Sequence, residues 1–126
     1  MRRYIIEFGL GTDFHGQDVT KAAVKAVKDA ISRSCLCGLW EVLHLKDLKQ
    51  GVKINVTVAV SRPEKVSLQE VRACLPIGTV EARAVSGGLN LPGLFLPQFG
   101  DQDDSIEVAL AAVEVIIPET EGVPQS

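Results

Sequence analysis

Several short segments alternate apolar with polar residues, which is the pattern of strands that bury one face. The clearest segment is 52–60, where Val52, Ile54, Val56, Val58 and Val60 alternate with other residues before Pro63 ends the pattern. Similar alternation predicts strands over 3–8 and 79–85, and the first of these stops where glycines begin. The apolar run 106–117 is rich in β-branched residues, so we expect a fourth strand there.

Two segments carry the period of a helix instead. Apolar residues from Val19 to Ile31 form one stripe, and Asp18 stands before them as a predicted N-cap. Ser67-x-x-Glu70 is a capping box that begins a second, short helix, which Pro76 ends. The predicted order is therefore β-α-β-α-β-β, an α+β fold with a mixed four-stranded sheet and two helices on one face. This order is similar to that of the chorismate-mutase-like fold, with a ferredoxin-like sheet as the alternative.

The length of 126 residues, 46% of them hydrophobic and 23% charged, fits one folded domain. We predict that this domain covers 1–117 and that 118–126 is a flexible tail. Segment 86–104 has no clear period but contains several leucines and phenylalanines, so it must pack on its own domain or on a neighbouring subunit. Together with a sheet face that is only partly polar, this predicts a homo-oligomer, a trimer or larger.

Charge and cysteine content restrict the partners and the compartment. A formal net charge of −3 argues against a nucleic-acid-binding protein, and no apolar run is long enough to cross a membrane. Cys35, Cys37 and Cys74 are an odd number of cysteines, so we expect reduced thiols and a cytoplasmic protein. Small buried residues are the favoured interpretation of these cysteines, and a redox or metal role is the alternative. No metal or cofactor is predicted.

The densest polar cluster, 9–18, lies between the first strand and the first helix. It does not match a phosphate-binding loop, because Gly16-Gln17 stands where Walker A requires Gly-Lys-Ser/Thr, and Asp13 would repel a phosphate. Asp13 and His15 can face one target in an extended segment, so Asp13 can orient His15 as a general acid or base. A divalent metal site and a purely structural turn are the alternatives. The predicted ligand-binding residues here are Gly9, Gly11, Gly16, Gln17 and Asp18.

A second cluster, Ser86-Gly87-Gly88, follows the third predicted strand. Ser86 is a candidate catalytic residue if a base reaches it, and backbone N–H groups near Gly87 and Gly88 can hold an anion. A simple turn is the alternative. Together the two clusters predict a pocket for a small polar metabolite near a subunit boundary, with hydrolase or lyase chemistry in its catalytic form. A non-catalytic regulatory or assembly module is the other hypothesis, and whether the protein is an enzyme stays open.

The pattern Gly9-x-Gly11-x-Asp13-x-His15-Gly16 resembles the signature of a small uncharacterised family of bacterial and plant proteins. The resemblance covers nearly the whole chain, including Ser86-Gly87-Gly88, and it implies no established activity. Ser86-Gly87-Gly88 is also similar to one repeat of the ring-opening amidohydrolases of the cyanuric acid and barbiturate type. That resemblance implies Ser-Lys chemistry, with Lys46 or Lys53 as the base.

Overall fold

The computed structural model describes residues 2–14, 18–32, 51–75, 78–93, 97–99 and 105–117. Several residues that the sequence singled out lie outside the described residues. They are His15, Gly16 and Gln17 of the predicted site, together with Cys35, Cys37 and Lys46. The predicted tail 118–126 also lies outside this part of the chain.

The described part of the chain contains five strands and two helices, and the predicted α+β fold is confirmed. Short 3-10 turns at Pro63–Lys65 and Pro97–Phe99 accompany them. Strand β4 was not predicted, because four residues within the irregular segment 86–104 are too few to show a period. The elements in chain order are β1 (Arg2–Asp13), α1 (Val19–Ile31), β2 (Lys53–Val60), α3 (Leu68–Arg72), β3 (Thr79–Ser86), β4 (Leu89–Pro92) and β5 (Ser105–Ile117).

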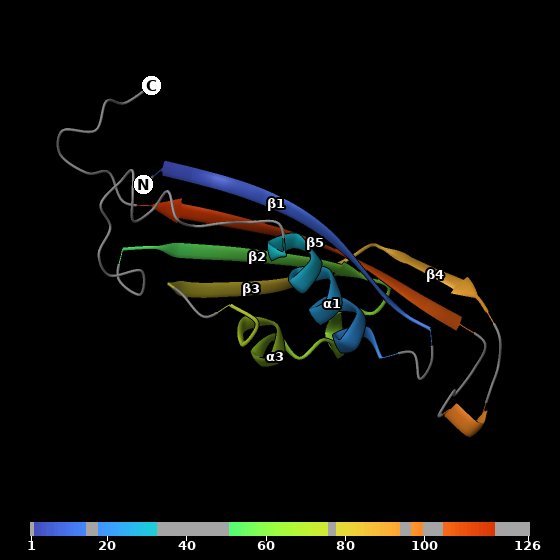
Figure 1. Ribbon diagram of the computed structural model, residues 1–126. Coiled ribbons are helices and arrows are strands. Elements are labelled where there is room, and N and C mark those ends of the chain that lie inside the picture. The colour runs from blue at the N-terminus through green and yellow to red at the C-terminus, as the bar shows by residue number, and fades with distance from the viewer. Residues whose placement is uncertain are drawn as a thin grey trace, which may run out of the picture.

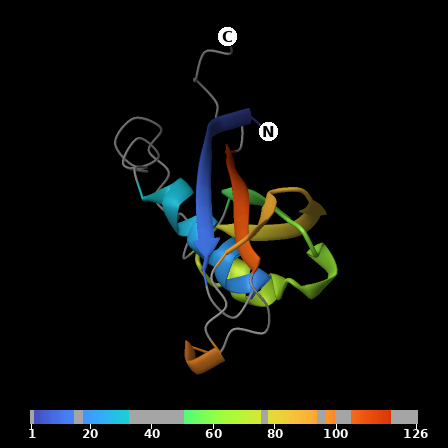
Figure 2. The ribbon, with the colours of Figure 1, turned by 90° about the vertical axis from the view of Figure 1, so that its right-hand side faces the viewer.

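The sheet is mixed, with the strand order β1-β5-β2-β3 (Figure 1). Strands β2 and β3 run parallel, whereas β5 is antiparallel to β1, β2 and β4. Strand β4 pairs with β5 next to the end of β2, so it extends the four predicted strands to five. The last strand of the described chain, β5, therefore stands in the middle of the sheet, between β1 and β2 (Figure 1, Figure 2).

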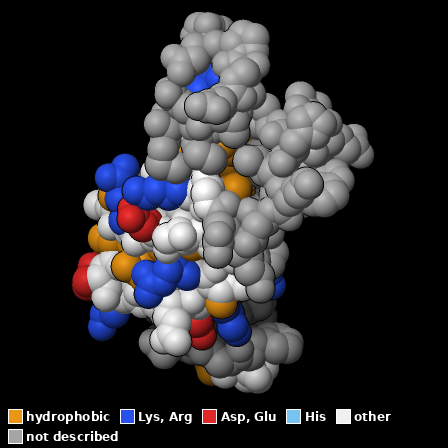
Figure 3. All heavy atoms as spheres, turned by 90° about the vertical axis from the view of Figure 1, so that its left-hand side faces the viewer, with side chains coloured by type: hydrophobic (Ala, Val, Ile, Leu, Met, Phe, Trp, Pro, Cys, Tyr) orange, Lys and Arg blue, Asp and Glu red, His pale blue; other side chains and the backbone are white. Residues whose placement is uncertain are grey.

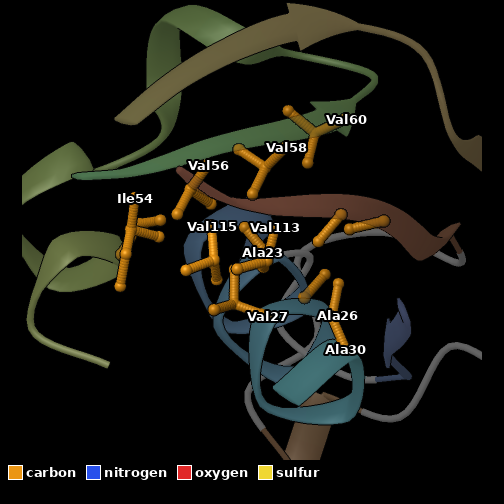
Figure 4. Packing of buried hydrophobic residues seen from close by; sticks show 14 of the residues in the cluster. Ala23, Ala26, Val27, Ala30, Ile54, Val56, Val58, Val60, Val113 and Val115 are labelled. Carbon is orange, nitrogen blue, oxygen red and sulfur yellow. The ribbon is translucent and has the colours of Figure 1, made fainter. Parts of the chain in front are cut away.

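Helix α1 covers one face of the sheet over β1 and β5, and α3 lies beside α1 and β3 (Figure 1). The branched residues of β2 and β5 point from the sheet toward the alanines and Val27 of α1 (Figure 4). Both predicted caps are present, since the Asp18 side chain accepts hydrogen bonds from the N–H groups of Thr20 and Lys21, and Ser67 accepts from Glu70. The core is thus a single apolar layer between one helical face and one sheet face.

Strand β1 is longer than predicted, because it continues through Gly9 and Gly11 to Asp13. The sequence suggested that these glycines break the strand, but they face α1 instead. A methyl group at Gly11 would lie 2.7 Å from the Lys25 Cβ and still closer to backbone atoms of Ala22 and Ala26. The absence of side chains at Gly9 and Gly11 therefore allows the backbone of α1 to lie almost directly on β1.

The opposite face of the sheet, called the open face here, is not covered by either described helix. Strand register places residues such as Ile6, Glu114 and Asn55 in one row across this face. Its large apolar side chains are well exposed, up to 66% for Phe8. Those on the described strands are Ile6, Phe8, Leu10, Val85, Leu89, Leu91 and Leu110. The prediction of a partly apolar second face is therefore in agreement with the exposed side chains.

Candidate functional site

A row of three polar side chains crosses the sheet at the end where β1 finishes. Asp13 of β1 lies opposite Glu107 of β5, and Glu107 lies opposite Asn90 of β4. This row is on the helix-covered face, because it continues the rows in which Gly9 and Gly11 lie opposite buried alanines of β5. Asp13 is 5% exposed and Glu107 is completely buried, so two carboxyl groups lie side by side in the protein interior.

Glu107 accepts three hydrogen bonds from two other segments. Its Oε2 accepts from the Ser61 N–H at 2.9 Å, and its Oε1 accepts from the Ser61 hydroxyl at 2.6 Å and from Asn90 Nδ2 at 3.0 Å. A buried carboxylate without such donors would be strongly unfavourable, so these bonds are a condition for its burial. Through Glu107, β5 is joined to the residue after β2 and to β4.

Asp13 is bound to the start of α1. Its Oδ2 accepts a hydrogen bond of 2.7 Å from the Asp18 N–H. Asp18 in turn uses its Oδ1 to accept from the N–H groups of Thr20 and Lys21, at 2.9 and 3.1 Å. Asp13 therefore ties the end of β1 to the N-cap of α1.

The structure brings the second predicted cluster to the same end of the sheet. Ser86 is exposed and lies opposite Val60 at the end of β2, next to Ser61. Gly88 has a φ of 68°, and a methyl group there would collide with the backbone of Val108. The Gly87 N–H donates a hydrogen bond to the Val60 carbonyl at 2.9 Å, so it is not available for the predicted binding of an anion.

A hollow of about 450 Å³ lies on the open face, between Ile6, Asn55, Thr57, Glu81, Arg83 and Glu114. Glu114 forms an ion pair with Arg3, and Asn55 donates a further hydrogen bond to it at 3.3 Å. The hydrogen bond from Arg3, followed by that from Asn55, lowers the pKa of Glu114 from its usual 4.5. Charged side chains of both signs lie among apolar ones when the molecule is seen from the end where β1 begins (Figure 3).

A second hollow, of about 630 Å³, lies between α1 and α3 and is lined by Lys21, Lys28, Glu70 and Cys74. Burial is the main cause that raises the pKa of the Cys74 thiol above 9.0, the charge of Glu70 raises it further, and Lys28 lowers it. Cys74 is therefore a poor nucleophile, in agreement with a structural interpretation of this cysteine.

Two findings concern the described residues as a whole. Within the described ranges, no group of three or more His, Cys, Asp or Glu side chains is placed to hold a metal ion. The described helices include none that is both long and apolar enough to span a membrane.

Comparison with known proteins identifies relatives of this chain. The model of a family described as conserved hypothetical protein (Lin0512_fam) matches residues 3–115. The chain belongs to the Lin0512_fam family. This confirms the predicted membership of an uncharacterised family. The similarity to ring-opening amidohydrolases stays a prediction, and no curated protein matches the chain.

A solved structure supports the fold of this Lin0512_fam chain. It is the crystal structure of an FtsZ-like protein of unknown function from Nostoc punctiforme, which is 42% identical in sequence with a TM-score of 0.84. The alignment covers 94% of this chain and 97% of the Nostoc chain. The whole described architecture is therefore shared with an experimental structure.

Sequence reasoning about this Lin0512_fam chain missed Ser61, Asn90 and Glu107. A signal for Glu107 was present, because it is in phase with Ala109, Ala111 and the other inward-facing residues of β5, and a charged residue at such a position requires an explanation. Ser61 and Asn90 carried no comparable signal. Their roles follow only from the sheet order, which places the end of β2 and the start of β4 next to β5.

Proposed function

We propose that the end of the sheet around Asp13, Ser61, Asn90 and Glu107 forms part of the binding site for a small polar metabolite. The observation that supports this proposal is the pair of buried carboxyl groups, Asp13 and Glu107, at neighbouring positions of β1 and β5. Neighbouring buried carboxyl groups repel one another and lose hydration, and proteins retain such arrangements mainly where they serve a function.

The chemistry of these side chains indicates the class of ligand. Carboxyl groups present acceptor oxygens, and the carbonyl of Asn90 and the hydroxyl of Ser61 can accept as well. A metabolite with amino or hydroxyl groups suits such a site, whereas a phosphate or another carboxylate would be repelled. In the catalytic form of the proposal, His15 exchanges a proton with the substrate, Asp13 orients His15, and Ser86 completes the site for hydrolase or lyase chemistry.

The test is a thermal-shift screen with amino and polyhydroxy metabolites, followed by calorimetry on any compound that stabilises the protein. A ligand at about 100 times its Kd adds roughly 2.7 kcal/mol of stability, which is easily measured. We expect the His15→Ala and Asp13→Asn variants to lose this effect. Glu81→Gln, which changes an exposed carboxylate on the open face, is the matched control and retains it. Equal binding by all three variants would contradict the proposal.

The alternative, an assembly module without catalysis, is supported by the exposed apolar residues of the open face, such as Phe8 and Leu110. We propose for both cases that the protein is a cytoplasmic homo-oligomer, with the free thiol of Cys74 in agreement with a reducing compartment. The predicted size, a trimer or larger, stays a prediction. Sedimentation of His15→Ala separates the alternatives. An intact oligomer without ligand binding supports the metabolite site, and an altered oligomer supports the assembly module.

A further inference from the structure

Strand β1 is at an edge of the sheet, and α1 blocks only the second half of that edge. The Leu10 N–H, which points away from β5, donates to Asp29 Oδ2 at 3.0 Å. The Thr12 carbonyl points the same way and accepts from Lys25 Nζ at 2.9 Å. Two side chains of α1 thus occupy backbone groups that another strand would otherwise use.

Among the described residues, no side chain occupies the outward backbone groups in the first half of the same edge. The register between β1 and β5 is regular from Ile5 to Asp13, so the backbone groups of Ile6 and Phe8 point outward like those of Leu10. In the part of the chain that the structure describes, no hydrogen bond to these outward groups is found. The side chains of Ile6 and Phe8 are also exposed, by 37% and 66%. An edge of this kind is a template for an added strand.

The register shifts between Arg3 and Ile5, so Tyr4 has no partner of its own on β5. Because of this β-bulge, the backbone groups of Arg3, not those of Tyr4, are the next to point outward before Ile6. The unprotected outward positions are therefore Arg3, Ile6 and Phe8. We propose that a second copy of the chain pairs its own β1 with this edge, antiparallel and about a two-fold axis, with Ile6 opposite Ile6. This inference rests on the homo-oligomer proposed above and specifies its contact.

Several two-fold registers of β1 against β1 are conceivable, and the charged side chains and the backbone groups already bound by α1 favour the one centred on Ile6. If the pair were centred on Phe8, the backbone N–H and carbonyl of Leu10 would have to join it, but the Leu10 N–H already donates to Asp29 of α1. If the pair were centred on Glu7 or on Arg3, like charges would lie opposite each other. Centring it on Ile5 would place Phe8 opposite a position before Arg2, outside the described residues of β1. With Ile6 at the centre, all three outward positions are paired, and Arg3 lies opposite Phe8 of the second copy, where a cation can contact an aromatic ring.

The pairing would join the two sheets into one continuous sheet, with both open faces on the same side. Helix α1 of each copy would remain on the other side, since an axis perpendicular to the sheet preserves its faces. The exposed apolar residues of β1 would then meet across the axis, which would reduce the exposure of Ile6 and Phe8.

The experiment is analytical ultracentrifugation of the wild-type protein and of variants at position 6. We expect the wild type to sediment as the dimer that this contact forms, and not as the trimer or larger oligomer that the sequence suggested. Ile6→Pro removes an outward N–H that the pairing with β5 does not use, and Ile6→Lys and Ile6→Glu each place like charges opposite one another. All three should sediment as monomers with cooperative unfolding. A mixture of Ile6→Lys and Ile6→Glu should restore the dimer, because Ile6 faces itself only in the proposed register.

The outcomes separate this inference from the proposed oligomer. If Ile6→Lys and Ile6→Glu remain oligomeric while Leu110→Lys, in the middle of the open face, dissociates the protein, the oligomer stands and the edge contact is wrong. A wild type that sediments as a single chain overturns both. If the Ile6→Lys and Ile6→Glu variants are monomeric but do not associate when mixed, the register with Ile6 at the centre is wrong. The two charged variants keep the test valid even if Ile6→Pro does not fold.

Discussion

Replacement of Gly11 by alanine should destabilise the protein, although the same exchange often stabilises others. Alanine at a compatible site adds about 0.4–1 kcal/mol, because it restricts the unfolded chain. Gly11 does not have a positive φ, so the backbone conformation alone does not require glycine. The obstacle is α1, since a methyl group at Gly11 would lie 2.7 Å from the Lys25 Cβ and closer still to the Ala22 carbonyl oxygen and the Ala26 nitrogen.

The magnitude follows from how far α1 would have to move. Ordinary contacts between heavy atoms begin near 3.4 Å, and the nearest atoms are backbone atoms that cannot rotate away. The helix must therefore retreat by on the order of 1 Å, and a gap of that size loses a quarter to a half of each van der Waals contact. Overpacking of this kind costs about 1–3 kcal/mol and occasionally more. Subtracting the gain in the unfolded state leaves a net loss of roughly 1–2 kcal/mol.

Urea unfolding of Gly11→Ala and wild type measures this difference directly, and a loss of about 1–2 kcal/mol lowers the Tm by several degrees. Gly87→Ala is the matched control, because the added methyl would meet chiefly the Ala59 methyl group at 2.9 Å, which is a softer conflict than helix backbone. We expect its loss to be the smaller one. Equal or greater stability of Gly11→Ala would refute the close packing of α1 on β1.

Three further predictions concern titratable groups. Glu107→Ala should cost about 1–3 kcal/mol in urea unfolding, because the part-buried donors of Ser61 and Asn90 lose their acceptor, and a loss below about 1 kcal/mol would contradict this. The lowered pKa of Glu114 stabilises the folded protein at pH values above the unfolded pKa, and this stabilisation is lost as the pH falls through the folded pKa. NMR titration should show that Arg3→Met moves the pKa of Glu114 back toward 4.5. An unchanged pKa would refute the ion pair. The raised pKa of Cys74 predicts slower alkylation than that of free cysteine near pH 8, measured by peptide mass spectrometry, and faster alkylation would contradict the burial.

The fold could be predicted largely from periodicity, because the alternation in segments such as 52–60 records which side of a strand faces the core. The predicted end of β1 was wrong, because the residues there are required by a tertiary contact that the local sequence pattern does not show. Gly9 and Gly11 suggested a break, since glycine is unfavourable in strands, but here glycine allows α1 to approach. Nothing local to the strand indicates that requirement. The length of β1 was therefore underestimated for a physical reason.

The candidate site was predicted only in part, because most of its contacts join distant segments. Asp13 and Asp18 are close in sequence, so a link between them could be expected from a turn. Glu107 meets Ser61 and Asn90 through strand order alone, and no single-sequence pattern specifies that β5 lies between β1 and β2. The carboxyl groups were visible in the sequence, but their proximity was not.

The central position of β5 has a consequence for how the chain is synthesised. On the ribosome, β1 emerges well before Ser105–Ile117, yet β5 is its neighbour in the described sheet, so β1 cannot pair until that strand is available. The register joins Arg2 to Ile117, so the loop that must close spans the whole described domain, and such a high contact order makes folding slow. The nascent domain must therefore remain unfinished and vulnerable to aggregation until β5 has been translated. A premature stop before β5 would leave β1 and β4 without the strand that they pair with in the described sheet, and only β2 and β3 could still pair.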